Sequence, residues 1–120
     1  MREEYPDGVN DGRTELKEAI CVFYVAGVKF HQLKTCIDEV EVGMYLTMTP
    51  EPENKFDPNA VSLEFASLEQ TKNIMVGYVP AKMSASVTAS LMIKEHVAEV
   101  IEVNKDAKTW EQLKVAIKEA

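Results

Sequence analysis

Residues 50–65 read PEPENKFDPNAVSLEF, and this stretch sets the character of the chain. Its first ten residues hold three prolines, two asparagines and an aspartate, which is typical of a loop with defined turns. From residue 60 to residue 65 polar and apolar side chains alternate, with Val61, Leu63 and Phe65 on one face, as in a strand with one buried side. A structured polar loop that leads directly into a strand predicts a β-rich domain.

Strand signals recur on both sides of this stretch. Short runs rich in β-branched, aromatic and other apolar residues, bounded by turn residues, predict strands at 20–26, 43–48, 74–79 and 97–103. The first strand is expected to continue over 28–32, past a bulge at Gly27, and residues 68–73 are expected to form a hairpin loop.

Helical patterns are fewer. Met83, Val87 and Leu91 recur every four residues after Pro80, which predicts an amphipathic helix of about three turns. A short helical turn is expected at 14–19, and the tail at 109–120 fits a helix and a strand equally well. Five or six short strands with one or two short helices predict a mainly β (α+β) fold, arranged as a small barrel or curled sheet.

The length and the N-terminal composition indicate a single domain with a tail. A chain of 120 residues is long enough to bury one core. We expect residues 1–13 to form an acidic flexible arm and residues 14–120 to form one domain. No stretch approaches the roughly 18 apolar residues of a membrane helix. The N-terminal residues MREEYPDGVNDG contain no apolar signal core, so we expect a cytoplasmic protein without a membrane contact.

The charge of the chain argues against general affinity for nucleic acid. Twenty acidic residues outnumber 13 basic ones, giving a net charge of −7, and the excess is spread over the chain without a basic run. Non-specific attraction to a polyphosphate depends on clustered lysines and arginines. Any nucleic-acid site must therefore be local.

Residues for catalysis or metal binding form no recognisable pattern. Cys21 and Cys36 are expected to be free and packed, and neither they nor His31 and His96 have the spacing of metal ligands. Phosphate-binding, dinucleotide-binding and serine-nucleophile motifs are absent from the sequence. We therefore expect a binding module with no cofactor and no metal, and not an enzyme.

Three segments carry a family resemblance in their order along the chain. They are VAGVKFH at 25–31, EPENKFDPNAV at 51–61 and VGYVP at 76–80, the last followed by a helix with small residues. Together they resemble the HIRAN domain family over residues 20–103 and the tail. The resemblance implies a small OB-like or SH3-like antiparallel β-barrel of five to six strands, and it favours a strand over residues 111–118.

The resemblance also implies a ligand, because HIRAN domains of chromatin-type helicases capture the 3′ end of single-stranded DNA. It implies a nucleic-acid-binding module for 3′-hydroxyl ends, acting in DNA repair, replication-fork processing or defence. Phe30 and Phe56 would then sandwich terminal bases, while Asp57 would accept a hydrogen bond from the 3′-hydroxyl and repel a phosphate. The other expected contacts are Lys29, His31, Asn54, Asn59, Tyr78 and Lys82.

Each of these residues also has a purely structural interpretation. Phe30 could belong to the strand core, and Phe56 could fold inward to fasten its loop. Asp57 and the two asparagines could serve only as turn residues, and the two lysines could be solvated.

Departures from the family pattern support a second hypothesis. Lys29 replaces an arginine, His31 an aromatic residue, Glu53 the first residue of an asparagine pair, and Ala81 a lysine. The alternative is a protein-interaction or adaptor module that kept the barrel without DNA binding. In either case a protein partner would supply any motor or nuclease activity.

Overall fold

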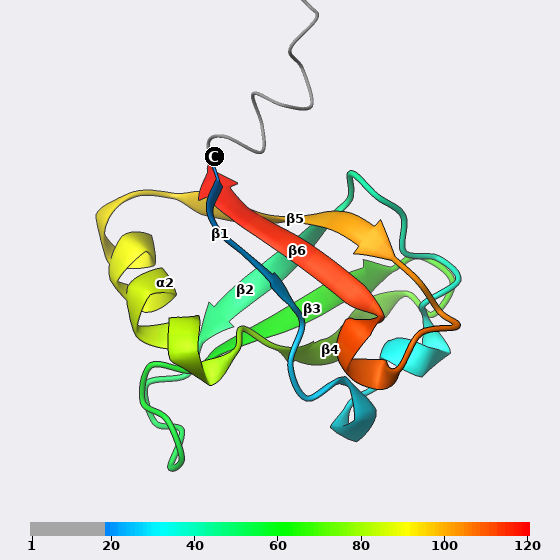
Figure 1. Cartoon of the computed structure of the whole chain (residues 1–120), viewed down its shortest axis with the longest axis horizontal. Coiled ribbons are helices and arrows are strands. Elements are labelled where there is room, and N and C mark those ends of the chain that lie inside the picture. The colour runs from blue at the N-terminus through cyan, green and yellow to red at the C-terminus, as the bar shows by residue number, and fades with distance from the viewer. Residues whose placement is uncertain (1–18) are drawn as a thin grey trace, which may run out of the picture.

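The computed structural model describes residues 19–120, and within them it contains six strands and one α-helix. The strands are β1 (Ala19–Tyr24), β2 (Tyr45–Pro50), β3 (Val61–Ser67), β4 (Lys72–Tyr78), β5 (His96–Val103) and β6 (Leu113–Glu119). The α-helix is α2 (Ala81–Ile93), and three short 3-10 helices are η2 (Val28–Phe30), η3 (Leu33–Thr35) and η4 (Thr109–Glu111) (Figure 1). The predicted mainly β class is confirmed, and the predicted arm at 1–13 lies outside the described residues.

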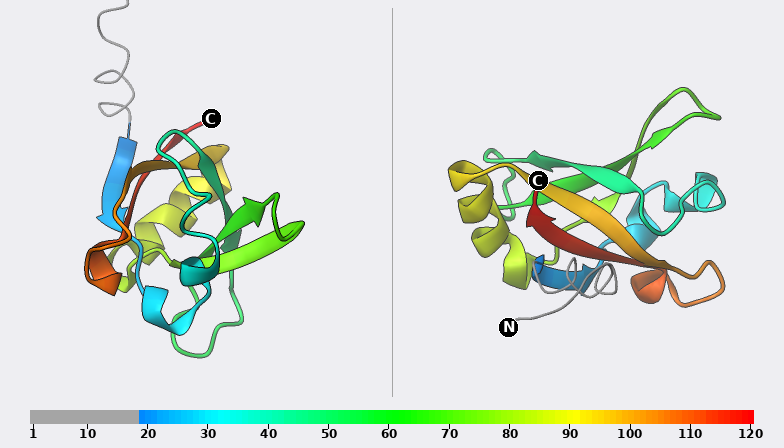
Figure 2. Two further views of the ribbon diagram at one scale, coloured as in Figure 1. Left: turned by 90° about the vertical axis from the view of Figure 1, so that its right-hand side faces the viewer. Right: turned by 90° about the horizontal axis from the view of Figure 1, so that it is seen from above.

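All six strands form one antiparallel sheet in the order β1-β6-β5-β2-β3-β4. β2 joins its two halves, because it pairs with β3 at Thr47 to Pro50 but with β5 only at Tyr45 and Leu46. The sheet bends at this short pairing, and its two halves face each other across the core (Figures 1 and 2).

The two edges of the sheet approach each other just after β1. Ala26 and Tyr78 exchange two backbone N–H···O hydrogen bonds of 2.9 Å, which link the chain after β1 to the end of β4. This contact is an isolated bridge and not a continuous ladder. The strand pairing therefore shows a curled six-stranded sheet, while a closed OB-like or SH3-like barrel stays a prediction.

The core lies between the two halves of the sheet and is closed at one end by α2. Its most completely buried side chains are Val25, Leu33, Val61, Leu63, Val76, Val87, Val100, Leu113, Val115 and Ile117. From α2, Val87 is fully buried, and the half-buried Met83 and Leu91 pack against the same core. The predicted apolar stripe of this helix is thus confirmed as a core contact.

Both cysteines are free thiols, as expected: Cys21 is half-buried and Cys36 is buried. Burial and the nearby carboxylate of Glu39 raise the pKa of Cys36 to about 11.

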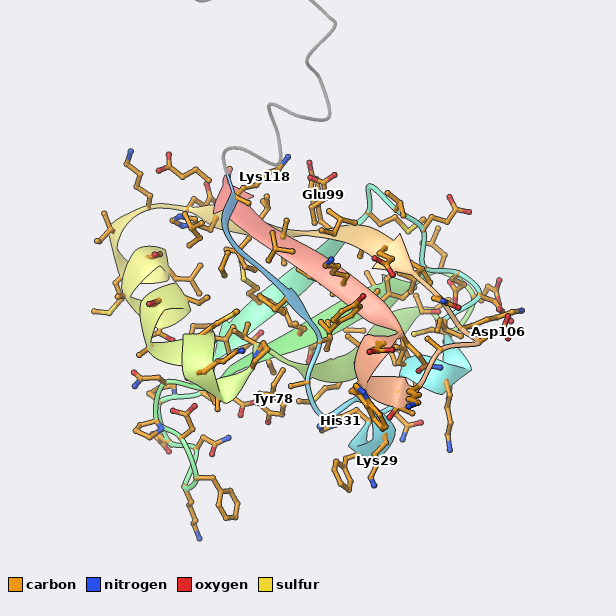
Figure 3. The ribbon with its side chains drawn as sticks, viewed as in Figure 1. Lys29, His31, Tyr78, Glu99, Asp106 and Lys118 are labelled. Carbon is orange, nitrogen blue, oxygen red and sulfur yellow. The ribbon has the colours of Figure 1, made fainter. Side chains whose placement is uncertain are left out.

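The C-terminal tail is a strand and not a helix. β6 lies between β1 and β5, so its backbone pairs on both sides. On its outer face Lys118 Nζ lies 2.8 Å from Glu99 Oε1 in a pair with little solvent exposure (Figure 3). The expected helical character is limited to the single turn η4.

One sequence-based expectation is wrong near the N-terminus of the described region, and another is tested only at its last residue. Residues 28–32 do not continue the first strand, because Gly27 adopts a left-handed conformation with φ of 71° and the chain enters η2. The N–H groups of Phe30 and His31 then donate to the carbonyls of Gly27 and Val28, which closes a tight turn. Ala19, expected at the end of a helical turn, begins β1; the rest of that turn, residues 14–18, lies outside the described residues.

Gly77 permits the close approach at the Ala26–Tyr78 bridge. A Cβ atom at this position would lie 2.5 Å from Val25 Cγ1 and even closer to the Ala26 carbonyl oxygen, with φ at 156°. Gly43, by contrast, also has a positive φ, of 98°, but has open space where its Cβ would be.

We expect Gly77→Ala to lower the free energy of unfolding by about 3 kcal/mol, because backbone and core must both shift to admit a methyl group. Gly43→Ala is the matched control and should cost only about 1 kcal/mol, from backbone strain alone. Urea unfolding followed by tryptophan fluorescence measures both. Equal losses in the two variants would show that the contact at Ala26 does not constrain residue 77.

Candidate nucleic-acid interface

The loop at 51–60 connects β2 to β3 and is held at its base by backbone hydrogen bonds. Glu51 N–H donates to the Ala60 carbonyl and Ala60 N–H to the Asp57 carbonyl, both at 2.9 Å. Within the loop, Asn54 Oδ1 accepts the N–H groups of Phe56 at 2.8 Å and Asp57 at 3.1 Å. This is the turn chemistry for which asparagine is favoured, and it fixes the backbone on both sides of Phe56.

Phe56 lies at the tip of this loop with 98% of its surface exposed. It does not fold inward, which was the structural alternative for this residue. The ring is therefore an exposed apolar surface on a backbone held by hydrogen bonds, and it does not pack in the described core.

Asp57 attaches the loop to the first turn of α2. Its Oδ2 accepts a hydrogen bond of 2.7 Å from the hydroxyl of Ser84, and its Oδ1 accepts one of 2.9 Å from the N–H of Asn59. One turn further along the helix, Thr88 Oγ1 donates to the Asn59 carbonyl at 2.8 Å. Asp57 and Asn59 therefore have the structural roles that the sequence allowed. Since each carboxylate oxygen can accept two hydrogen bonds, each oxygen of Asp57 keeps capacity for another donor.

Tyr78 connects the loop to the turn after β1. Its hydroxyl donates a hydrogen bond of 2.8 Å to Glu51 Oε1, and the same oxygen accepts one of 3.0 Å from Asn54 Nδ2. Its ring lies 5.6 Å from the His31 ring, tilted by 57°. Desolvation, the hydrogen bond to Glu51 and the charge of Glu51 raise the pKa of the phenol, in that order.

A pocket of about 350 Å³ opens where these elements meet. It is lined by Ala26, Gly27, Asn54, Phe56, Asp57, Ala60, Tyr78, Val79 and Ala81. Four residues expected from the sequence are therefore brought together, namely Asn54, Phe56, Asp57 and Tyr78. Most of the remaining lining is small and apolar, which suits the face of a planar ring.

The other expected residues lie outside this lining. Phe30 is 76% exposed on η2 and is not part of the core, and Lys29 Nζ lies 5.2 Å from the centre of its ring. His31 follows and contacts Tyr78, and Figure 3 shows Lys29, His31 and Tyr78 at the same lower edge of the molecule. Asn59 is exposed beyond the pocket, and Lys82 is exposed on the first turn of α2.

The structure adds an aromatic residue that the sequence placed only in the tail at 109–120, where helix and strand fit equally well. Trp110 is 61% exposed on η4, and η4 lies beside η2. Lys108 Nζ lies 5.4 Å from the centre of the Trp110 ring, and Lys114 Nζ lies 5.2 Å from that of Tyr24. A lysine two positions before the chain's single tryptophan was the available signal. Its position next to η2 could not be inferred without the topology.

A comparison with protein families assigns the chain to a family. Residues 20–118 match the model of the HIRAN domain. The chain belongs to the HIRAN domain family. The HIRAN match extends to residue 118, within β6, so it includes most of the tail as well as the three segments that carried the resemblance.

A solved structure shares the fold of this chain. A crystal structure of a protein from Lactobacillus plantarum, a structural genomics target, superposes with a TM-score of 0.67 at 18% sequence identity. The superposition covers 82% of this chain and 90% of the other. No curated protein matches the chain.

Two further findings concern the described part of the HIRAN domain. Across residues 19–120, no helix is long and apolar enough to cross a membrane. The same residues contain no group of three or more histidine, cysteine, aspartate or glutamate side chains that could hold a metal ion.

We expect Ser84→Ala to destabilise the attachment of the 51–60 loop, because it leaves Asp57 Oδ2 without its buried donor. Losing a hydrogen bond to a charged group costs about 1.5–3 kcal/mol. Ser86→Ala on the exposed side of the same helix is the control and should have little effect. Urea unfolding gives the energies, and amide exchange at Asn59 reports the loop. Equal exchange at Asn59 in both variants would contradict the role of Ser84.

We expect Glu51→Gln to lower the pKa of Tyr78 towards the ordinary 10.0, because it removes the charge that opposes ionisation. A folded-state pKa above the unfolded value stabilises the protein below pH 10, and this contribution is lost as pH rises through the raised pKa. The variant should therefore lose less stability between neutral pH and strongly alkaline pH. Titration of ¹³C-labelled tyrosine by NMR checks the pKa, with Glu53→Gln on the same loop as control; an equal shift in both variants would refute the pairing.

Proposed function

We propose that this HIRAN domain captures the 3′-hydroxyl end of single-stranded DNA in the pocket beside the 51–60 loop. The observation that carries the proposal is the exposed Phe56 ring on the lining of a pocket that also contains the Asp57 carboxylate. Every base presents a π-face, and stacking on an aromatic side chain contributes about 1–3 kcal/mol per base. The loop is already held in place by its own hydrogen bonds, so binding costs little ordering of the protein.

Asp57 supplies selectivity for the chemical form of the end. A 3′-hydroxyl can donate a hydrogen bond to the remaining lone pair of either carboxylate oxygen. A 3′-phosphate offers no such donor when ionised, and it would bring like charges together. The negative charge of Asp57 therefore favours a 3′-hydroxyl end over a 3′-phosphate end.

The exposed aromatic rings on η2 and η4 form a second surface, on which the DNA strand can continue beyond its terminal base. The turn η2, which carries Phe30, lies beside η4, which carries Trp110. Both rings are largely exposed, and each has a lysine near it. We propose that the bases following the terminal one stack here, with Lys29, Lys108 and Lys114 close to the phosphates. Phe30 and Phe56 then contact different nucleotides, which replaces the single sandwich expected from the sequence.

The net charge of −7 restricts this binding to local contacts. Three lysines near phosphates give a slope of log affinity against log salt of about −2, from about −0.7 per contact for single strands. Unwinding or cutting the captured end requires a motor or a nuclease, and we propose that a protein partner supplies it, in repair, fork processing or defence.

Fluorescence anisotropy with a labelled ten-nucleotide strand tests the proposal. Phe56→Ala should weaken binding about 5- to 150-fold through the lost stacking. Met92 is another largely exposed apolar residue, on α2, and Met92→Ala should leave the affinity unchanged. Trp110→Ala should weaken the binding of the ten-nucleotide strand more than the binding of a dinucleotide.

The end chemistry is tested on the same instrument. The unmodified strand should bind at least tenfold more tightly than the strand with a 3′-phosphate, and Asp57→Asn should narrow this difference. Equal binding of both strands by the unaltered domain would exclude the role of Asp57. Absence of binding at low salt would exclude DNA capture altogether.

A further inference from the structure

A second groove lies at the opposite end of the β2–β3 pair from the 51–60 loop. β2 ends and β3 begins at that loop, whereas the start of β2 and the end of β3 border a groove of about 670 Å³. Its apolar walls include Met44 and Tyr45 from β2 and the segment before it, and Leu68 from the β3–β4 hairpin. The buried side chain of Phe65 lies beneath them.

The apolar residues of this groove are unusually open to solvent. Leu68 is 88% exposed and Tyr45 is 57% exposed, and the neighbouring Val42 is 64% exposed. Exposed apolar side chains grouped around one concavity are typical of an interaction site. Within the described residues, no segment covers this groove.

The groove is held in shape by the carboxylate of Glu39. Its Oε2 accepts a hydrogen bond of 2.6 Å from the Ser67 hydroxyl, and its Oε1 accepts the N–H groups of Leu68 at 3.2 Å and Glu69 at 3.3 Å. On the same hairpin, Gln70 Nε2 donates to the Thr35 carbonyl at 3.0 Å. These hydrogen bonds fix the hairpin against the segment before β2, and they thereby hold Leu68 in its exposed position.

The charged residues that line the groove all have the same sign. Besides Glu39 they are Asp38, Glu41 and Glu69, and the lining contains no lysine or arginine. One of these acids is partly neutralised, since Lys105 Nζ lies 3.2 Å from Asp38 Oδ1 on the surface. An apolar floor with an acidic rim is complementary to a basic segment that carries apolar side chains.

Charge excludes the other obvious occupants. DNA would be repelled by the rim, and a second copy of this chain carries a net charge of −7. The chain's own residues 1–18 hold six acidic and three basic groups, so they are also unfavourable. We propose that this groove binds a basic, apolar-anchored peptide segment of a partner protein, independently of the DNA site.

A fluorescein-labelled peptide of three lysines, leucine, phenylalanine and three lysines provides the probe. With ¹⁵N-labelled protein we expect saturable binding and shift changes at the amides of Met44, Tyr45 and Leu68. A peptide with serines in place of leucine and phenylalanine should bind at least fivefold more weakly. Failure to saturate up to about 1 mM peptide would overturn the proposal.

Variants separate this groove from general charge attraction. Leu68→Ser should weaken binding at least fivefold, and Glu41→Lys with Glu69→Lys at least tenfold. The control double variant Glu95→Lys with Glu111→Lys changes the net charge equally, at exposed positions outside the groove, and should have a smaller effect. Equal weakening by both double variants would reduce the interaction to net charge and overturn the proposal.

Peptide binding at this groove can be distinguished from DNA binding at the pocket. Leu68→Ser should leave the affinity for the 3′-hydroxyl strand unchanged, because Leu68 lies at the far end of β3 from the 51–60 loop. If DNA binding fails but the peptide binds as described, only the function proposed for the pocket is lost.

Discussion

The two hydrogen bonds between Ala26 and Tyr78 are the constraint on which the arrangement of the candidate site depends. They join the chain after β1 to the end of β4, two segments at opposite ends of the strand order. Because of this bridge, the Gly27 turn lies against the loop that follows β2, and Tyr78 can contact His31 and Glu51 together. Gly77 is the residue that makes the backbone approach possible. The geometry of the pocket therefore depends on a close backbone approach at which only glycine fits.

Much of the fold could be predicted because one-sided burial leaves a clear sequence pattern. Val61, Leu63 and Phe65 alternate since β3 has one face on the core, and Val87 repeats with Met83 and Leu91 since α2 covers that core. The tail could not be assigned from its own residues. Leu113, Val115 and Ile117 are compatible with either period, and pairing of β6 with β1 and β5 decides between them.

The site was less predictable, for a physical reason that differs between residues. Val28 and Phe30 alternate with polar residues as a strand would, but the left-handed turn at Gly27 redirects the chain and leaves Phe30 exposed. Trp110 gains its place beside η2 only through the pairing of β6 with β1. The loop between β2 and β3 could be predicted from its sequence, because turn formation depends on local residues, here its asparagines, aspartate and prolines. What the sequence left open was whether Phe56 points outward, which no local rule decides.

The domain carries two surfaces of different electrostatic character. On η2 and η4, exposed aromatic rings lie near lysines, in a chain whose total charge is negative. At the start of β2 and the end of β3, the charged residues that line the apolar groove are all carboxylates. A nucleic acid and a basic polypeptide are attracted to opposite signs, so each surface repels the ligand suited to the other. In the functions proposed above, the net charge of −7 limits DNA contact to the pocket and the aromatic rings of η2 and η4, whereas a basic segment of a partner binds at the acidic groove.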